Sequence, residues 1–141
     1  AQTVAAKKLS VRETEKLATM VLGTVKNDIH EFGKDIVATI LRSNGVEVVD
    51  LGMDVDYEAF VAAVREHHPQ FVGMSCLLTT VFDDMKNTIA ALEDAGLRDG
   101  LQIYIGGGPV DESLVEYVGA DLYCRTAQDA VVAIKRHLGV N

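Results

Sequence analysis

The chain has 141 residues, 48% of them hydrophobic and 24% charged, which is the composition of one globular domain with a substantial core. Its net charge of −8 argues against nucleic acid as a main partner, because a phosphate backbone binds clustered lysine and arginine. No apolar run is long enough to cross a bilayer, and residues 1–8 lack the pattern of a signal peptide, so we expect a cytoplasmic protein with no membrane partner.

The first predicted elements are a buried strand and an amphipathic helix. The apolar run 20–25 predicts the strand, and the spacing of apolar residues within 36–41 predicts the helix. The segment 28–33, Asp-Ile-His-Glu-Phe-Gly, therefore lies in the turn that joins them. Loops at the carboxyl ends of parallel strands are where α/β sheets bind their ligands.

The rest of the chain alternates strand-like and helix-like patterns. Strands are predicted at 46–51, 71–75, 101–105 and 120–123, and helices at 57–64, 82–92, 111–117 and 127–138. Five strands with intervening helices predict an α/β fold in which a parallel sheet carries helices on both faces. At this length we expect the flavodoxin-like (Rossmann-like) strand order 2-1-3-4-5.

Cys76 and Cys124 are the only cysteines, and both lie in or beside apolar runs. Buried free thiols are therefore expected. The absence of a Cys-x-x-Cys pair disfavours structural zinc and thioredoxin-like chemistry.

The carboxyl ends of the first, third and fourth strands are neighbours in this order, so the segments 28–33, 75–80 and 106–109 should meet at one edge. In the first segment, His30 can bind a metal through one ring nitrogen while Asp28 accepts a hydrogen bond from the other. The alternative is that His30 begins the helix and Asp28 caps it.

The second segment offers hydroxyl groups and aliphatic walls. Ser75, Thr79 and Thr80 supply the hydroxyls, and Leu77 and Leu78 the walls, a lining that suits a ligand with polar and apolar parts. Alternatively, Ser75 only ends the strand and one of the threonines caps the next helix.

The third segment, Gly106-Gly107-Gly108-Pro109, leaves the backbone bare, so a ligand can approach it closely. A phosphate loop is one possibility, although no Walker lysine follows. A glycine turn without a ligand is the other.

Together, Asp28-x-His30-x-x-Gly33, Ser75-x-Leu77 and Gly106-Gly107 resemble the signature of cobalamin-binding domains. Segments 23–30 and 75–80 resemble the corrinoid proteins of methyltransferase systems, a group related to the cobalamin domain of methionine synthase. The resemblance implies a cobalamin-binding domain at 17–141, with 1–16 a linker or the remnant of a helical cap domain.

The resemblance also implies a cobalamin or a related corrinoid as cofactor, with His30 as the lower axial ligand of cobalt and Asp28 as its partner in catalysis. Gly33 would leave room for the corrin, the hydroxyl-rich and glycine-rich segments would enclose the nucleotide tail, and 123–126 would close its far end. The implied cofactor-binding residues are Asp28, Ile29, His30, Glu31, Phe32, Gly33, Ser75, Leu77, Thr79, Thr80, Gly106, Gly107, Gly108, Pro109, Tyr123, Cys124 and Thr126.

One position departs from this pattern. Methionine synthase has a serine hydroxyl that extends the His-Asp pair towards solvent, and Val81 occupies the matching position here. We expect a shortened relay, or one in which Thr80 substitutes.

The implied function is a methyl carrier between a donor-side and an acceptor-side methyltransferase, not active as an enzyme alone. The donor side would belong to an O-, N- or S-demethylation system, and the acceptor would be tetrahydrofolate or a thiol. A reductive activase would be a further partner. A subunit of an adenosylcobalamin-dependent mutase shares the fold and the histidine motif, but the Leu-Leu-Thr-Thr run at 77–80 favours the carrier. A non-catalytic corrinoid sensor would be expected to carry a DNA-binding appendage. A receiver domain would need an aspartate where Ser75-Cys76 stand.

Overall fold

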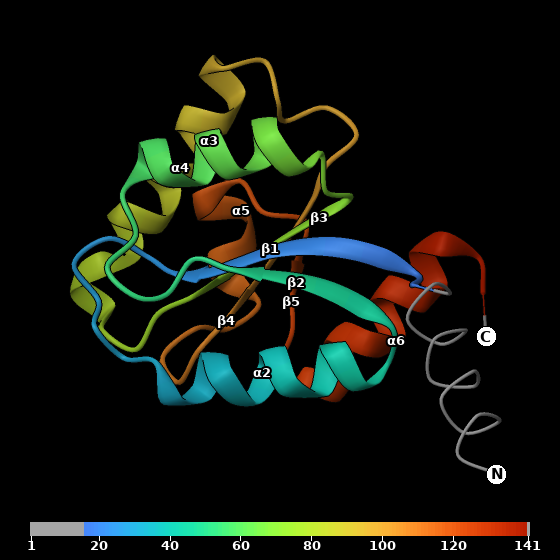
Figure 1. Cartoon of the computed structure of the whole chain (residues 1–141). Helices are drawn as coiled ribbons and strands as arrows, with labels where there is room; N and C mark the ends of the chain where they lie inside the picture. The colour runs from blue at the N-terminus through green and yellow to red at the C-terminus, as the bar shows by residue number, and fades with distance from the viewer. Residues whose placement is uncertain (1–15, 141) are drawn as a thin grey trace, which may run out of the picture.

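Residues 16–140 are described by the structure, a computed structural model (Figure 1). Its parallel strands form one sheet in the order β2-β1-β3-β4-β5, as predicted. The strands are β1 (Ala18–Thr24), β2 (Val46–Asp50), β3 (Phe71–Ser75), β4 (Gln102–Gly106) and β5 (Leu122–Tyr123). The helices are α2 (Phe32–Ser43), α3 (Tyr57–His67), α4 (Phe82–Asp94), α5 (Ser113–Val118) and α6 (Ala127–Leu138), with a short 3-10 turn η1 (Thr79–Val81) before α4.

Helices cover both faces of the sheet, which confirms the predicted layers. Figure 1 shows α2 and α6 on one face and α3, α4 and α5 on the other. Each face has its own apolar core, because side chains that alternate along a strand point to opposite faces. On β3, for example, Val72 and Met74 pack towards α3 and α4, whereas Phe71 packs towards α6.

Several boundaries differ from the prediction by one or two residues. β1 begins earlier than expected and ends at Thr24, because the chain turns at Asn27, whose φ is 73°. Val25 retains only an isolated bridge to Val55. β2 ends at Asp50, β4 is displaced by one residue, and β5 is reduced to two residues that pair with β4 alone.

The cysteine prediction is correct for Cys76 and wrong in part for Cys124. Cys76 is buried, and this burial raises the pKa of its thiol to about 12. Cys124 is only half-buried, because it lies just beyond the short β5, beside a cleft.

The predicted linker at 1–16 lies outside the described residues except for Lys16, which forms an ion pair of 2.9 Å with Glu47. Between residues 16 and 140, no helix has the length and apolar character needed to span a membrane.

The carboxyl ends of three strands meet in register. Thr24 of β1 pairs with Ser75 of β3, and Ser75 pairs with Gly106 of β4. The loops that follow these residues are the segments 28–33, 75–80 and 106–109, so their predicted convergence at one edge of the sheet is confirmed.

Candidate ligand-binding cleft

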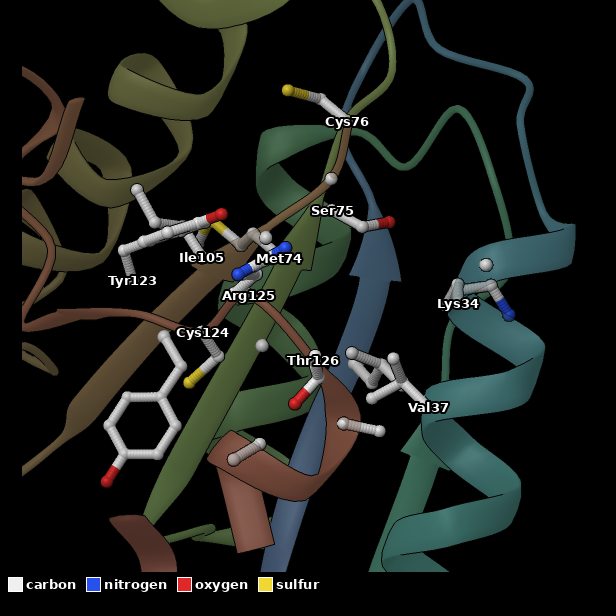
Figure 2. A pocket seen from close by; sticks show the side chains of 18 of the residues that line it. Lys34, Val37, Met74, Ser75, Cys76, Ile105, Tyr123, Cys124, Arg125 and Thr126 are labelled. Carbon is white, nitrogen blue, oxygen red and sulfur yellow. The ribbon is translucent and has the colours of Figure 1, made fainter. Parts of the chain in front are cut away.

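A cleft of about 390 Å³ opens between α2 and α6 at this edge of the sheet (Figure 2). Val37 stands on the α2 wall and Thr126 on the α6 wall, with Ser75 at the end of β3. Of the predicted cofactor-binding residues, the cleft is lined by His30, Gly33, Ser75, Leu77, Gly106, Gly107, Gly108, Tyr123, Cys124 and Thr126. The others, which lie outside the lining, are Asp28, Ile29, Glu31, Phe32, Thr79, Thr80 and Pro109.

Asp28 joins the first loop to the second. Its carboxylate is fully buried, and Oδ1 accepts from the His30 backbone N–H at 3.0 Å and lies 2.7 Å from His30 Nδ1. Oδ2 accepts from the backbone N–H groups of Leu77 at 2.6 Å and Leu78 at 3.2 Å. Burial raises the pKa of the Asp28 carboxyl, but these hydrogen bonds outweigh it and hold that pKa below its ordinary value of 3.8.

An ionised Asp28 determines the tautomer of His30. A carboxylate can only accept hydrogen bonds, so His30 Nδ1 must carry a proton, and in the neutral ring Nε2 keeps its lone pair. The His30 side chain is 45% exposed at the mouth of the cleft. The ring is therefore an oriented donor for a metal ion or an acceptor for a proton.

The helix-cap interpretation of this loop is wrong. The N-cap of α2 is Glu31, without a side-chain cap, and Phe32 is already the first helical residue. Because both oxygens of Asp28 are used by His30 and the second loop, Asp28 serves to link the loops.

The proton of the Ser75 hydroxyl is already used in a hydrogen bond within the protein. The Thr24 hydroxyl donates to the His30 carbonyl at 2.9 Å and lies 3.0 Å from Ser75 Oγ. Since Thr24 has one proton to donate, Ser75 must donate to Thr24. Towards the cleft, Ser75 can then only accept a hydrogen bond.

Thr79 and Thr80 are exposed residues of the turn η1, and neither caps a helix in the described part of the chain. The N-caps of η1 and α4 are Leu78 and Val81, both without a side-chain cap. The capping interpretation of Thr79 and Thr80 is therefore wrong. Val81 is buried, and in place of a relay hydroxyl Asp28 Oδ2 receives two backbone N–H groups.

The glycines that line the cleft differ in what an added Cβ would meet. Gly107 has a φ of 130°, and a Cβ there would lie 1.8 Å from the Cys76 carbonyl oxygen, so packing alone requires glycine. Gly33 and Gly108 also line the cleft, but a Cβ at either would meet nothing within 4 Å. The free space at these two positions is open to a ligand.

Apolar side chains are exposed around His30. Ile29 is 69% exposed, Phe32 80% and Leu77 47%. Exposed apolar groups close to a cleft are typical of a binding surface.

Sequence reasoning missed two residues that support the site. Thr24 is fully buried and fastens the His30 backbone to the sheet. Lys34 lies at the start of α2, and its ammonium binds Asp50 at 2.6 and 2.7 Å and Asp35 at 2.9 Å. In the sequence, Thr24 stands out as a polar residue inside an apolar strand. Lys34 stands out because it has helical spacing with the buried Ala38 and Leu41.

We expect the Lys34–Asp50 pair to make stability depend on acid pH. Burial raises the pKa of Asp50, but Lys34 and the Gly52 N–H hold that pKa below its ordinary value of 3.8. A depressed carboxyl pKa stabilises the fold above the unfolded pKa, and this stabilisation is lost as the pH falls through the folded pKa. Asp50→Asn should destabilise the chain by about 1–3 kcal/mol near neutral pH.

Urea unfolding should show that this difference starts to shrink as the pH falls below 3.8 and disappears below the folded pKa, where Asp50 of the folded parent is also protonated. Asp35→Asn is the control, because the Asp35 side chain is 53% exposed and its variant should change stability much less. An equal loss for Asp50→Asn at neutral and acid pH would show that the charge of Asp50 is not the cause.

Comparison with known proteins identifies close relatives. Residues 18–135 match a family described as the B12 binding domain. Trimethylamine corrinoid protein 2 of Methanosarcina mazei is 42% identical over 128 residues, which are 91% of this chain and 59% of that protein.

Two solved structures share the fold. A cobalamin-binding protein from Desulfitobacterium hafniense has a TM-score of 0.83 and 42% identity, covering 86% of this chain and 59% of its own. The methanol:cobalamin methyltransferase complex of Methanosarcina barkeri contains a chain with a TM-score of 0.83 and 31% identity, covering 90% of this chain and 48% of its own. The chain thus spans less than two thirds of the length of these three proteins.

Proposed function

The chain belongs to the B12-binding domain family, and we propose that it is a corrinoid protein that carries a methyl group between two partner methyltransferases. The observation that carries this proposal is the His30 ring at the mouth of the cleft, oriented by the buried Asp28 carboxylate. In this proposal, Nε2 of His30 would be the ligand that the protein supplies to the cobalt of the cofactor. A single imidazole supplies one ligand, and a corrin brings its own ring nitrogens to the metal.

The cleft fits such a cofactor in shape and chemistry. Gly33 leaves free space in the cleft lining, and exposed apolar surface is supplied by Leu77 in the lining and by Ile29 and Phe32, which flank His30 in the sequence. The space between α2 and α6 accommodates a nucleotide tail, with Ser75 as a hydrogen-bond acceptor in its wall. When bound, the corrin supplies a cobalt centre that accepts and releases a methyl group.

The residues of this chain would tune and present that centre. Asp28 holds the proton on His30 Nδ1, so that Nε2 keeps a lone pair that would bind the metal of the cofactor. The same carboxylate would stabilise a protonated imidazole whenever Nε2 is not bound to the metal. With Val81 at the relay position, Asp28 is the last side chain of the proposed proton path.

The partners are proposed from the relatives. Trimethylamine corrinoid protein 2 is named for a methylated amine, which favours a methylamine as donor here. The solved methanol:cobalamin methyltransferase complex supports a separate methyltransferase on the donor side. An acceptor-side methyltransferase that delivers the methyl group to tetrahydrofolate or a thiol, and a reductive activase, complete the proposed system.

His30→Ala tests the ligand directly. The chain is labelled with ¹⁵N-histidine and loaded with cobalamin, and the cobalt is reduced to its paramagnetic divalent state. In the parent, electron paramagnetic resonance should show coupling to one ¹⁵N nucleus, because Nε2 is bound to the metal. His30→Ala should lose this coupling entirely, and the absorbance should shift to that of a cofactor without a histidine ligand.

His67→Ala is the control, because this histidine lies at the end of α3 and pairs with Glu66 away from the cleft. Unchanged ¹⁵N coupling in His30→Ala would exclude His30 as the ligand.

Loaded parent protein should also accept a methyl group from a methylamine methyltransferase. Preferential binding of adenosylcobalamin with mutase activity would instead support the mutase alternative.

A further inference from the structure

Two residues in the left-handed backbone region contact each other beside the loop that carries His30. Between residues 16 and 140, the residues other than glycine with a positive φ are Asn27 (73°), Asp54 (50°) and His68 (47°). His68 ends α3 as a left-handed cap, which is a common helix ending. Asn27 and Asp54 instead lie in the loops after β1 and β2, which run side by side in Figure 1. A side chain is kept in this region only where its surroundings determine it.

Asp54 holds the neighbouring loop at two points. Its Oδ1 accepts from the Asn27 backbone N–H at 2.8 Å, and its own backbone N–H donates to the Asp28 carbonyl at 2.8 Å. The Asn27 N–H is the main cause that holds the pKa of the Asp54 carboxyl below its ordinary value of 3.8, so the acceptor is ionised at neutral pH. One residue thus fixes the backbone on both sides of the Asn27–Asp28 peptide bond.

This contact lies on the turn from which Asp28 projects. Residues 25–28 form a turn that the Asp28 N–H closes by donating to the Val25 carbonyl at 3.1 Å. A left-handed φ at the third residue, here Asn27, is the pattern of a type II turn. Asp28 Oδ1 in turn lies 2.7 Å from His30 Nδ1. The conformation of the turn is therefore passed to the His30 ring through one side chain.

The Asp54 carboxylate can be removed without opening the pairing of the two loops. The Val55 N–H donates to the Thr24 carbonyl at 3.1 Å, and Val25 forms a bridge to Val55. These contacts involve only the backbone, so they remain in a variant at position 54. The Asp54 side chain is also 45% exposed, so its removal leaves no buried cavity. What is lost is the acceptor of the Asn27 N–H.

We propose that Asp54 is a positioning residue for His30, because its carboxylate sets the turn 25–28 and, through that turn, the Asp28–His30 pair. This inference rests on the proposed function, in which His30 binds the cofactor. A binding group has to be held to within about 0.5 Å of its productive place. The loss of Asp54 should therefore reduce the part of the cofactor affinity that His30 supplies and leave the rest of the cleft unaffected.

A double-mutant cycle tests whether Asp54 acts through His30. Dissociation constants for methylcobalamin are measured for the full chain, Asp54→Gly, His30→Ala and the double variant. Glycine is chosen because it adopts a φ of 50° without strain and removes only the side chain. With His30 present, Asp54→Gly should weaken binding by about fivefold. In the His30→Ala background the loss should be less than about twofold.

Two further variants serve as controls. Asp54→Asn keeps an oxygen acceptor and tolerates the left-handed φ, so it should bind within about twofold of the parent. Asp56→Gly removes the other carboxylate beside Lys26, whose Nζ lies 2.8 Å from Asp56 and 3.6 Å from Asp54. Asp56 is the N-cap of α3 without a side-chain hydrogen bond, and glycine is accepted there. Asp56→Gly should therefore leave the affinity unchanged.

Amide hydrogen exchange in the chain without cofactor gives a second measurement. The His30 N–H donates to Asp28 Oδ1, so a turn that is no longer fixed should expose it more often. In Asp54→Gly, exchange at the Asn27 and His30 amides should accelerate more than exchange at Ile89, which is buried in α4 and reports unfolding of the core. Equal acceleration at all three amides would indicate a general loss of stability and would contradict a positioning role.

The outcomes separate this inference from the proposed function. A parent that binds no methylcobalamin, or that binds it equally well without His30, would overturn both. Equal losses for Asp54→Gly in the two backgrounds, or no loss in either, would overturn the role of Asp54 alone. An Asp54→Asn chain that binds as weakly as Asp54→Gly would also overturn it, because the charge beside Lys26 would then be responsible instead of the acceptor of the Asn27 N–H.

Discussion

Replacing Asp28 with alanine is expected to destabilise the chain without its cofactor by about 2–4 kcal/mol and to remove the fixed orientation of His30. The buried carboxylate accepts from Leu77 and Leu78 N–H and from the His30 backbone, so its loss leaves these donors without their acceptor. Urea unfolding measures the first effect. The ¹⁵N-histidine coupling of the loaded protein measures the second, which should weaken or become heterogeneous.

Asp28→Asn removes the negative charge of the side chain while nearly keeping its shape. Both oxygens of Asp28 accept hydrogen bonds, whereas an asparagine has one oxygen and must turn its NH₂ group towards a donor. If that NH₂ faces His30 Nδ1, the ring proton moves to Nε2 and metal binding is lost.

Asp56→Asn is the matched control, because this side chain is 68% exposed and, among residues 16–140, forms an ion pair with Lys26 alone. Exposed pairs contribute little, so its stability should change by less than about 1 kcal/mol. An Asp28→Ala chain that unfolds at the same urea concentration as the parent would contradict the role of the carboxylate as the link between the loops.

The architecture was largely predictable because apolar periodicity alternates cleanly along this chain. Each strand is a short apolar run, each helix has one apolar face, and the strand order then follows from the length and the right-handed crossovers. The strand order brought three loops together, which is why a motif as weak as Asp-x-His-x-x-Gly became informative. The errors at β4 and β5 arose at strand ends, where pairing with a neighbour decides the limit.

The contacts that hold the site in place were not predictable in the same way. The bonds from Leu77 and Leu78 to Asp28 join residues far apart in the sequence, and nothing local reveals that both carboxylate oxygens are used. The requirement for glycine at 107 depends on the Cys76 carbonyl, on another loop. The buried position of Lys34 depends on Asp50 at the end of β2, so a lysine that looks like surface charge becomes part of the core.

Gly33→Ala is expected to have opposite effects on the free chain and on cofactor binding. Gly33 lies in the first turn of α2 without a positive φ, and an added Cβ would meet nothing within 4 Å. Alanine is the better helix former, so the free chain should gain up to about 1 kcal/mol of stability. The same methyl group would occupy space reserved for the corrin in the proposed complex, which should weaken methylcobalamin binding by at least about tenfold.

Ser43→Ala controls for the helix effect, because Ser43 is the exposed last residue of α2 and lies outside the cleft lining. It should leave cofactor affinity unchanged. Thermal unfolding without the cofactor and titration with methylcobalamin are sufficient measurements.

A loss of both stability and affinity in Gly33→Ala would indicate a disturbed helix. Unchanged affinity would place the corrin away from the first turn of α2. Only higher stability combined with weaker binding agrees with a glycine kept bare for the cofactor at the expense of the helix that carries it.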